Sequence, residues 1–173
     1  GWAAVGPISP LPEALRILSV QFLFLLTAAF HEELVFRGYF LQNLEEAFGT
    51  YWAVAVSSII FSLFHLLNPH FSTFAFVNLV LAGVLFAAAY LLTRNLWLPT
   101  ALHFSWNYFQ GPVFGFPVSG VRFPSILALE ISQGNPILSG AAFGPEGGIT
   151  GTLACLLGIA IFIFWARRNA PKR

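Results

Sequence analysis

The sequence is poor in charge. Only 9% of its 173 residues are Asp, Glu, Lys or Arg, whereas 57% are hydrophobic. Soluble domains carry about 25% charged residues, so this chain lacks the polar surface that a monomer needs in water. Aspartate is absent altogether, and all 7 acidic residues are glutamate. The formal net charge of +1 gives no reason to expect a nucleic-acid partner.

Cysteine and methionine are scarce as well. The one cysteine, Cys155, lies in an apolar run, so no internal disulfide can form and we interpret it as a small core residue. Methionine is absent, and the sequence begins at Gly1. Because an open reading frame begins with methionine, we expect an N-terminal piece upstream, which could hold a signal peptide or further membrane spans.

Long apolar stretches take the place of charge. No Asp, Glu, Lys or Arg occurs between Glu46 and Arg94, for example. A membrane-spanning helix needs about 20 mostly apolar residues, and these stretches lack the alternation of β-barrel strands. We therefore predict an all-α, multi-pass transmembrane helical bundle in a single domain, 1–173. Its five helical segments are expected at 12–48, 51–67, 71–93, 96–109 and 148–166.

Turn-forming residues, among them Gly49 and Pro69, separate these segments. The helices that carry polar motifs fall within 12–109. The stretch 110–147 is rich in glycine and proline but contains apolar runs such as 125–131, so we expect a loop that is partly re-entrant. The segment 148–166 is a plain apolar helix followed by basic residues.

The basic residues predict an orientation. If the spans alternate, Arg94 and four basic residues at the C-terminus share one side, and Arg16 and Arg122 share the other. Arg37 is left out because we expect it to be buried. The excess of positive charge places the C-terminus in the cytoplasm, in a protein of the cell (inner) membrane.

Ionisable side chains within membrane spans are costly and mark functional sites. Glu33 and Arg37 lie four residues apart, so on a helix they share a face and can form an ion pair. Glu32 points about 100° away from Glu33 and is free to face another partner. The pattern indicates a structural acid beside a catalytic acid. The alternative is that the cluster marks a helix end at the membrane surface.

His65 is the next candidate. Glu32 lies 17 positions before Gly49, and His65 lies 16 positions after it. In an antiparallel helix pair both residues reach the same depth, roughly 25 Å from the turn. We therefore predict that Glu32 and His65 share a site, although a histidine near a helix end can also be purely structural.

His103 and Asn107 lie four residues apart on one helix face, where they could donate two hydrogen bonds or help to hold a metal. Asn78 is a polar companion on another segment. His31 and Glu32 look like the start of a zincin helix, but Val35 stands where its second histidine would be. A Gly-x-Ser-x-Gly elbow and a phosphate-binding loop are absent too.

Three short motifs thus lie on successive hydrophobic segments. They are Glu32-Glu33-x-x-x-Arg37, Phe61-x-x-x-His65 and His103-x-x-x-Asn107. In this order they resemble the CPBP family of intramembrane proteases, which includes the type II CAAX prenyl endopeptidases and bacterial Abi-type proteins. The resemblance runs from about residue 15 to residue 107, and the stretch 111–148 looks like a bacterial branch of that family.

The resemblance implies hydrolysis of peptide bonds inside the bilayer. By matching position, Glu32 and His65 would activate the water, while His103 and Asn107 would stabilise the oxyanion. Glu33 and Arg37 would support the site. The family is described both as glutamate-dependent and as metal-dependent, and the sequence leaves both open. Glu32, His65, His103 and a water could complete a tetrahedral zinc site, or the same residues could act without metal.

Two other functions stay open beside this intramembrane endopeptidase. One is a non-catalytic immunity or scaffold protein of the same fold, although the intact motifs argue against it. The other is a proton-coupled transporter that uses the same buried residues, although the sequence shows no inverted repeat. The expected partners are the lipid bilayer and a peptide or membrane-protein substrate; neither its identity nor the oligomeric state follows from the sequence.

Overall fold

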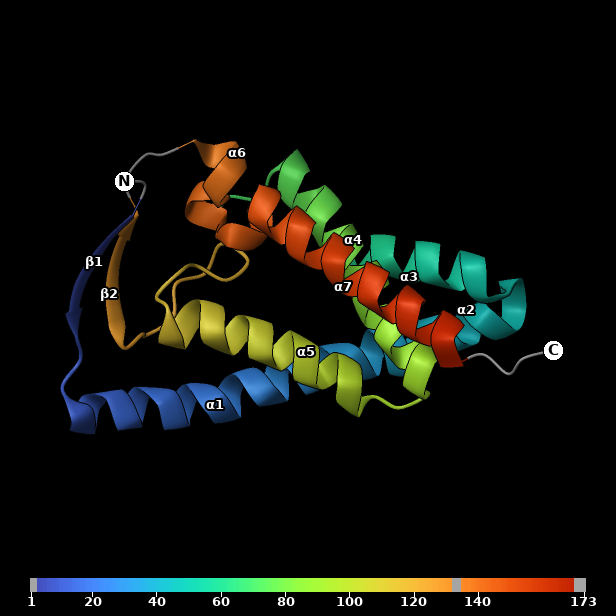
Figure 1. Ribbon diagram of the computed structural model, residues 1–173, viewed down its shortest axis with the longest axis horizontal. Coiled ribbons are helices and arrows are strands. Elements are labelled where there is room, and N and C mark those ends of the chain that lie inside the picture. The colour runs from blue at the N-terminus through green and yellow to red at the C-terminus, as the bar shows by residue number, and fades with distance from the viewer. Residues whose placement is uncertain (1–2, 132–134, 170–173) are drawn as a thin grey trace.

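The computed structural model describes residues 3–131 and 135–169, which fold around an antiparallel bundle of long helices (Figure 1). The first helical rod begins as α1 (Leu11–Glu33), continues through a π-helical stretch (Leu34–Phe40) and ends as α2 (Leu41–Phe48). The other long helices are α3 (Thr50–Leu63), α4 (Thr73–Thr93), α5 (Trp97–Tyr108) and α7 (Ile149–Asn169). The predicted α-helical bundle with five helical segments is confirmed.

Local sequence explains where these helices end. Gly49 adopts a φ of 80°, which favours glycine and lets the chain reverse between α2 and α3. Ser72 caps α4, because its Oγ accepts a hydrogen bond from the amide of Ala75 at 3.1 Å. Residues 64–67, predicted to be helical, form turns instead. The nearby Pro69 explains this difference, since proline disfavours a helix just before it.

A small β-sheet was not predicted from the sequence. β1 (Ala3–Ile8) pairs antiparallel with β2 (Leu127–Ile131), and Val5 lies opposite Leu129. β2 comes from the apolar run 125–131 that we expected to be part of a loop. The pair joins two segments more than a hundred residues apart and lies beyond the start of α1 (Figure 1).

The rest of the 110–147 stretch forms short elements at the end of the bundle where α1 begins (Figure 1). Residues 132–134, within the predicted loop, lie outside the described part of the chain. The described elements are a π-helical turn (Phe109–Val113), α6 (Pro136–Ser139) and two 3-10 turns (Ala141–Phe143 and Pro145–Gly147).

Glycine allows two helix pairs to approach closely. A Cβ atom on Gly83 of α4 would lie 2.8 Å from the Cα of Ser58 on α3, which is too close for any other residue without movement. A Cβ on Gly158 of α7 would lie 2.8 Å from the Cδ1 of Leu85 on α4. These contacts fix α3, α4 and α7 against one another.

The outward surface suits lipid. Three helical segments are long and apolar enough to cross a membrane: Leu11–Phe48, Thr73–Thr93 and Ile149–Arg168. On α7, Leu157 and Phe164 are 64% and 65% exposed. In water such a face would be an aggregation liability, whereas in a bilayer it faces hydrocarbon.

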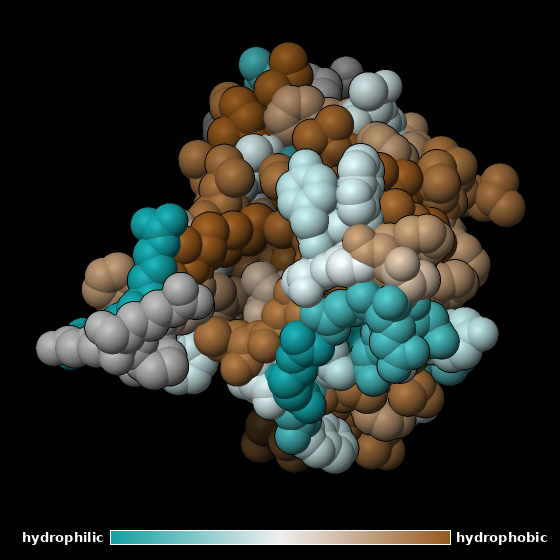
Figure 2. All heavy atoms as spheres, turned by 90° about the vertical axis from the view of Figure 1, so that its right-hand side faces the viewer, coloured by the Kyte–Doolittle hydropathy of each residue, from teal (hydrophilic) through white to brown (hydrophobic). Residues whose placement is uncertain are grey.

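Polar side chains gather at one end of the bundle. Gln42, Asn43 and Glu46 are exposed on α2, and Arg94 is exposed after α4. Figure 2, which looks at this end, shows hydrophilic side chains surrounded by hydrophobic ones. α7 also ends here, whereas the start of α1, with Arg16, lies at the opposite end (Figure 1). The predicted orientation assumes that Arg94 and the end of α7 lie on one side of the membrane and that Arg16 lies on the other.

Candidate active site

A buried ion pair with a histidine lies between α1, α4 and α5. The Nη1 of Arg37 lies 3.1 Å from the Oε1 of Glu33, and the Nδ1 of His103 lies 2.9 Å from the same oxygen. The side chains of Glu33, Arg37 and His103 are 0%, 2% and 7% exposed. The pairing of Glu33 with Arg37 expected from their spacing is therefore present, and it has a third member from α5.

Arg37 is held by several further contacts. Its Nη2 donates to the carbonyl oxygen of Gly83 at 3.2 Å. Its guanidinium carbon lies 4.7 Å from the ring centre of Phe61 and 5.1 Å from that of Phe86. Cation–π contacts of this kind gain strength where water is excluded. Arg37 lies in the π-helical stretch, a geometry often found at functional sites.

Glu32 has no such partners. Its Oε2 lies 4.0 Å from the Nε2 of His65 and 3.9 Å from the Nε2 of His103. Both distances exceed a direct hydrogen bond, and this oxygen is buried without a hydrogen-bond partner among the described residues. The contact with His65 confirms that the two residues reach the same depth. A polar separation above 3.5 Å is one that a water molecule can bridge.

Hydrogen bonds decide which nitrogen of each imidazole faces Glu32. The Nδ1 of His65 lies 2.9 Å from the carbonyl oxygen of Phe61, which can only accept, so Nδ1 carries the proton. By the same argument the Nδ1 of His103 donates to the carboxylate of Glu33. In its neutral form each ring therefore presents the lone pair of Nε2 toward Glu32.

The Oε2 of Glu32 and the Nε2 atoms of His65 and His103 are of the chemical types that bind zinc. Zinc-binding histidines usually donate their second ring N–H to a carbonyl or carboxylate, as His65 and His103 do here, and the Oε2 of Glu32 lacks a partner. The separations of 3.9 Å and 4.0 Å are wider than the roughly 3.3 Å expected between ligands of one tetrahedral zinc. Accordingly, the described residues include no preformed metal-binding group.

The two asparagines have different surroundings. Asn107 lies one turn after His103 on α5 and lines a cavity, and no described residue forms a hydrogen bond with its side chain. Asn78 is buried, and its Nδ2 donates to the carbonyl oxygens of Glu146 and Gly148 at 2.8 Å each. Its Oδ1 accepts from Thr152 at 2.7 Å. Asn78 thus anchors the start of α7, whereas Asn107 is free to meet a ligand.

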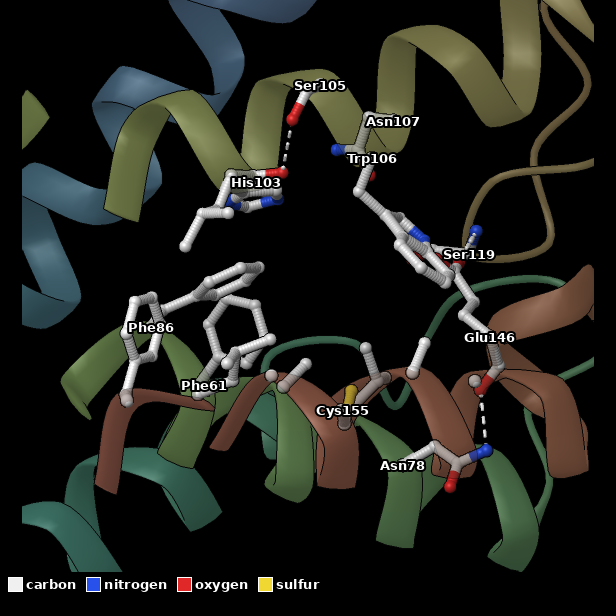
Figure 3. A pocket seen from close by; sticks show the side chains of 18 of the residues that line it. Phe61, Asn78, Phe86, His103, Ser105, Trp106, Asn107, Ser119, Glu146 and Cys155 are labelled. Atoms are coloured by element: carbon white, nitrogen blue, oxygen red, sulfur yellow. Dashed lines mark hydrogen bonds between the residues drawn. The ribbon is translucent and has the colours of Figure 1, made fainter. Parts of the chain in front are cut away.

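The cavity has a volume of about 460 Å³ and lies between α4, α5 and α7 (Figure 3). His65 and His103, the two histidines that flank Glu32, line it together with Asn107. Most of the remaining lining is apolar, with Phe86 and Leu102 near His103. A ligand in this cavity would therefore reach the imidazoles and Asn107 from an apolar environment.

Glu146 is a lining residue that the sequence interpretation missed. It lies in the Pro145–Gly147 turn just before α7, and its Oε2 accepts a hydrogen bond from the Nε1 of Trp106 at 3.1 Å. Its Oε1 accepts a hydrogen bond from the amide of Ser119. The signal that could have found it is a single acid within a run of glycines, Gly144 to Gly148, at the start of an apolar helix.

Comparison with protein-family models gives a match to the type II CAAX prenyl endopeptidase Rce1-like family over residues 14–109, more than half of the chain. The chain belongs to this family. Comparison with curated proteins gave no match, and comparison with solved structures gave none either. The family consists of membrane-embedded proteases, which agrees with the apolar helices of this chain and with a peptide substrate. All seven named residues of the three motifs lie within the matched range, whereas Glu146 lies outside it.

Proposed function

We propose that this protein is an intramembrane endopeptidase in which Glu32 activates the water that attacks the peptide bond. The observation that carries the proposal is the contrast between neighbouring acids: the Oε1 of Glu33 is bonded to both Arg37 and His103, while among the described residues neither oxygen of Glu32 has a partner at hydrogen-bond distance and its Oε2 is flanked by two imidazoles. A carboxylate that is not held in an ion pair is available to accept a proton from a neighbouring water. The substrate would be a peptide or a segment of a membrane protein.

The reaction follows from these positions. Glu32 takes a proton from the bound water, whose oxygen forms a bond to the carbonyl carbon of the substrate while the carbonyl electrons move to its oxygen. The C–N bond then breaks, and the proton on Glu32 passes to the departing nitrogen. The products are a carboxyl group and an amine.

The histidines and Asn107 support this reaction from the cavity side. The Nε2 of His65 accepts a hydrogen bond from the water and orients it toward the substrate. The amide of Asn107 donates to the developing oxyanion, a contact that gains strength in an apolar cavity. His103 can donate to the same oxygen from Nε2 when its ring carries both protons.

Zinc is the alternative way to activate the water. Glu32, His65 and His103 would hold the ion, which when bound would polarise the substrate carbonyl and acidify the water. In that case Glu33 would keep its role, because its hydrogen bond fixes the orientation of the His103 ring.

The decisive experiment is hydrolysis of a fluorogenic peptide library by the purified protein in detergent, with Glu32→Gln as the control. We expect cleavage by the wild type and none by the variant. Absence of cleavage across the library, with the protein shown to be folded, would reject the proposal. Activity that is lost on chelation and restored by zinc would select the zinc form over the metal-free form.

We also propose that the C-terminus lies in the cytoplasm and that the membrane is the inner membrane. The support is the basic charge on the end of the bundle that holds Arg94 and the end of α7. A reporter that is active only in the periplasm, fused after Arg173, should be silent. Strong activity of this fusion would reverse the orientation.

A further inference from the structure

Side-chain hydrogen bonds hold the second half of α5 in place. The Nδ1 of His103 lies 2.9 Å from the Oε1 of Glu33 on α1. On the side of the cavity, the Nε1 of Trp106 donates to the Oε2 of Glu146 at 3.1 Å (Figure 3). Asn107 follows Trp106 directly, and no described residue forms a hydrogen bond with its side chain. The direction in which Asn107 points therefore depends on how its helix is held.

The helix changes type just after Asn107. α5 ends at Tyr108 and continues as the π-helical turn Phe109–Val113, which contains Pro112. Proline has no backbone N–H to donate to a carbonyl group of the preceding turn, so fewer backbone hydrogen bonds fix the chain at this point. A side-chain hydrogen bond here has more influence on Asn107 than one within a long regular helix.

Glu146 is itself held in place. Its Oε1 accepts a hydrogen bond from the amide of Ser119, and its backbone carbonyl accepts one from the Nδ2 of Asn78 at 2.8 Å. The carbonyl oxygen of Ser119 accepts from the Nδ2 of Asn68 at 3.1 Å, and the backbone amide of Asn68 donates to the carbonyl oxygen of His65 at 3.0 Å. Glu146 thus connects α5 with α4 and with the turn that carries His65.

We propose that Glu146 is a positioning residue that, through Trp106, holds the amide of Asn107 in position to donate to the oxyanion. This inference rests on the proposed peptidase function and assigns a further residue to the same reaction. Most of the cavity lining is apolar, so binding of the substrate depends little on one amide. Oxyanion stabilisation needs a donor at hydrogen-bond distance from one oxygen. A shift of α5 at this turn would therefore lower kcat more than it raises KM.

This role does not require a charge on Glu146. Burial raises the pKa of its carboxyl group, and the neutral acid still accepts at both oxygens, because the hydroxyl oxygen keeps lone pairs beside those of the carbonyl oxygen. A glutamine side chain accepts only at its oxygen, since its amide nitrogen is a donor. Glu146→Gln therefore loses the hydrogen bond from either Trp106 or Ser119 while it keeps the size of the side chain.

Two variants break the contact from opposite sides. Glu146→Gln changes the acceptor, and Trp106→Phe removes the donor but keeps an aromatic ring. With a fluorogenic peptide that the wild type cleaves, each variant should lower kcat by about tenfold to a hundredfold and change KM by less than about threefold, as expected when a catalytic group is slightly misplaced. Glu46→Gln on α2 and Trp97→Phe at the start of α5 change exposed residues and should leave both constants unchanged.

The Asn107→Ala background shows whether the loss acts through Asn107. The oxyanion donor is already absent there, so adding Glu146→Gln or Trp106→Phe should lower kcat by less than about threefold. A purely structural role would lower kcat by the same factor in both backgrounds, and that result would overturn the proposal. A wild-type kcat in both single variants would overturn it as well.

The same measurements separate this inference from the proposed function. A folded wild-type protein that cleaves no peptide would reject the proposed function, and this inference with it. Cleavage that depends on Asn107 but not on Glu146 or Trp106 would reject the inference alone. Thermal melts identify any variant that does not fold, and Trp106→Phe decides the question if Glu146→Gln is such a variant.

Discussion

Glu32 and Glu33 are adjacent in the chain and have opposite surroundings. Glu33 is completely buried, and its Oε1 receives both Arg37 and His103 at hydrogen-bond distance. Glu32 is partly exposed, and its nearest histidine nitrogens are 3.9 Å and 4.0 Å away. The difference arises from the helix itself, because neighbouring residues on a helix point in different directions.

The comparison shows how one turn of helix can supply both stability and reactivity. A carboxylate whose charge is balanced by Arg37 is costly to disturb, so it can hold two neighbouring helices in place. A carboxylate that has no described partner at hydrogen-bond distance, such as that of Glu32, is available to take a proton. The following predictions test this comparison by changing the two acids, their partners or a residue that serves as a reference for them.

The largest effect is expected at Glu32. Glu32→Gln preserves shape but removes the base, so turnover should fall by about 10²–10⁴-fold while the melting temperature is retained. His65→Ala should fall in the same range, and the double variant should be little worse than either single one, because both act on one water. Peptide hydrolysis and thermal melts measure this. Additive losses would show that the two residues act independently.

Arg37→Ala should act on stability first. It leaves Glu33 as an unpaired buried charge, which typically costs about 3–5 kcal/mol, so the yield of folded protein should fall together with activity. The paired change of Glu33→Gln and Arg37→Ala should recover part of the yield. Size-exclusion profiles and thermal melts in detergent provide the readout, and a well-folded, fully active Arg37→Ala protein would contradict the structural role of the pair.

Asn107→Ala should be milder than the loss of Glu32. Removing a single oxyanion donor typically costs about 10²–10³-fold in kcat, and because Asn107 has no hydrogen bond to the described part of the chain, the fold should tolerate the change. Measurement of kcat and KM separates the two effects. An increase in KM alone would show that Asn107 binds the substrate without stabilising the oxyanion.

The smallest effect is expected at a surface counterpart of the buried pair. Arg94 and Glu45 form two hydrogen bonds, one of them 3.0 Å long, but the Arg94 side chain is 58% exposed. Solvent screens such a pair, and exposed pairs contribute about 0.2–1 kcal/mol at most. Glu45→Gln should therefore shift the melting temperature far less than Arg37→Ala. A comparable shift would mean that burial does not determine how much these ion pairs contribute to stability.

Contacts between residues near in sequence, or related by a single turn, were predictable. The Glu33–Arg37 pair follows from a spacing of four residues on a helix, and the meeting of Glu32 with His65 follows from counting to Gly49. The contact of His103 with Glu33 was not predicted, because it depends on α5 packing beside α1. The sequence grouped His103 with Asn107 through their shared helix face, whereas in the structure its hydrogen-bond partner is Glu33.

The elements beyond α5 were the hardest to predict. Glu146 reaches the cavity through a loop of more than thirty residues without helical periodicity, so its place depends on contacts such as that with Trp106. The pairing of β1 with β2 joins segments at opposite ends of the sequence, and the apolar run of β2 resembled any other buried stretch. Neither feature has a local pattern that distinguishes it from an ordinary loop.

The shortness of α3 has a consequence for the supply of water. With 14 residues the helix is about 21 Å long, whereas the hydrocarbon core of a bilayer is about 30 Å thick. His65 lies two residues after its end, so we expect this part of the chain to lie below the level that a full-length span such as α4 would reach, and a short span of this kind is accommodated by a thinner bilayer beside it. We therefore expect water to reach Glu32 through this thinner region, at the end of α3.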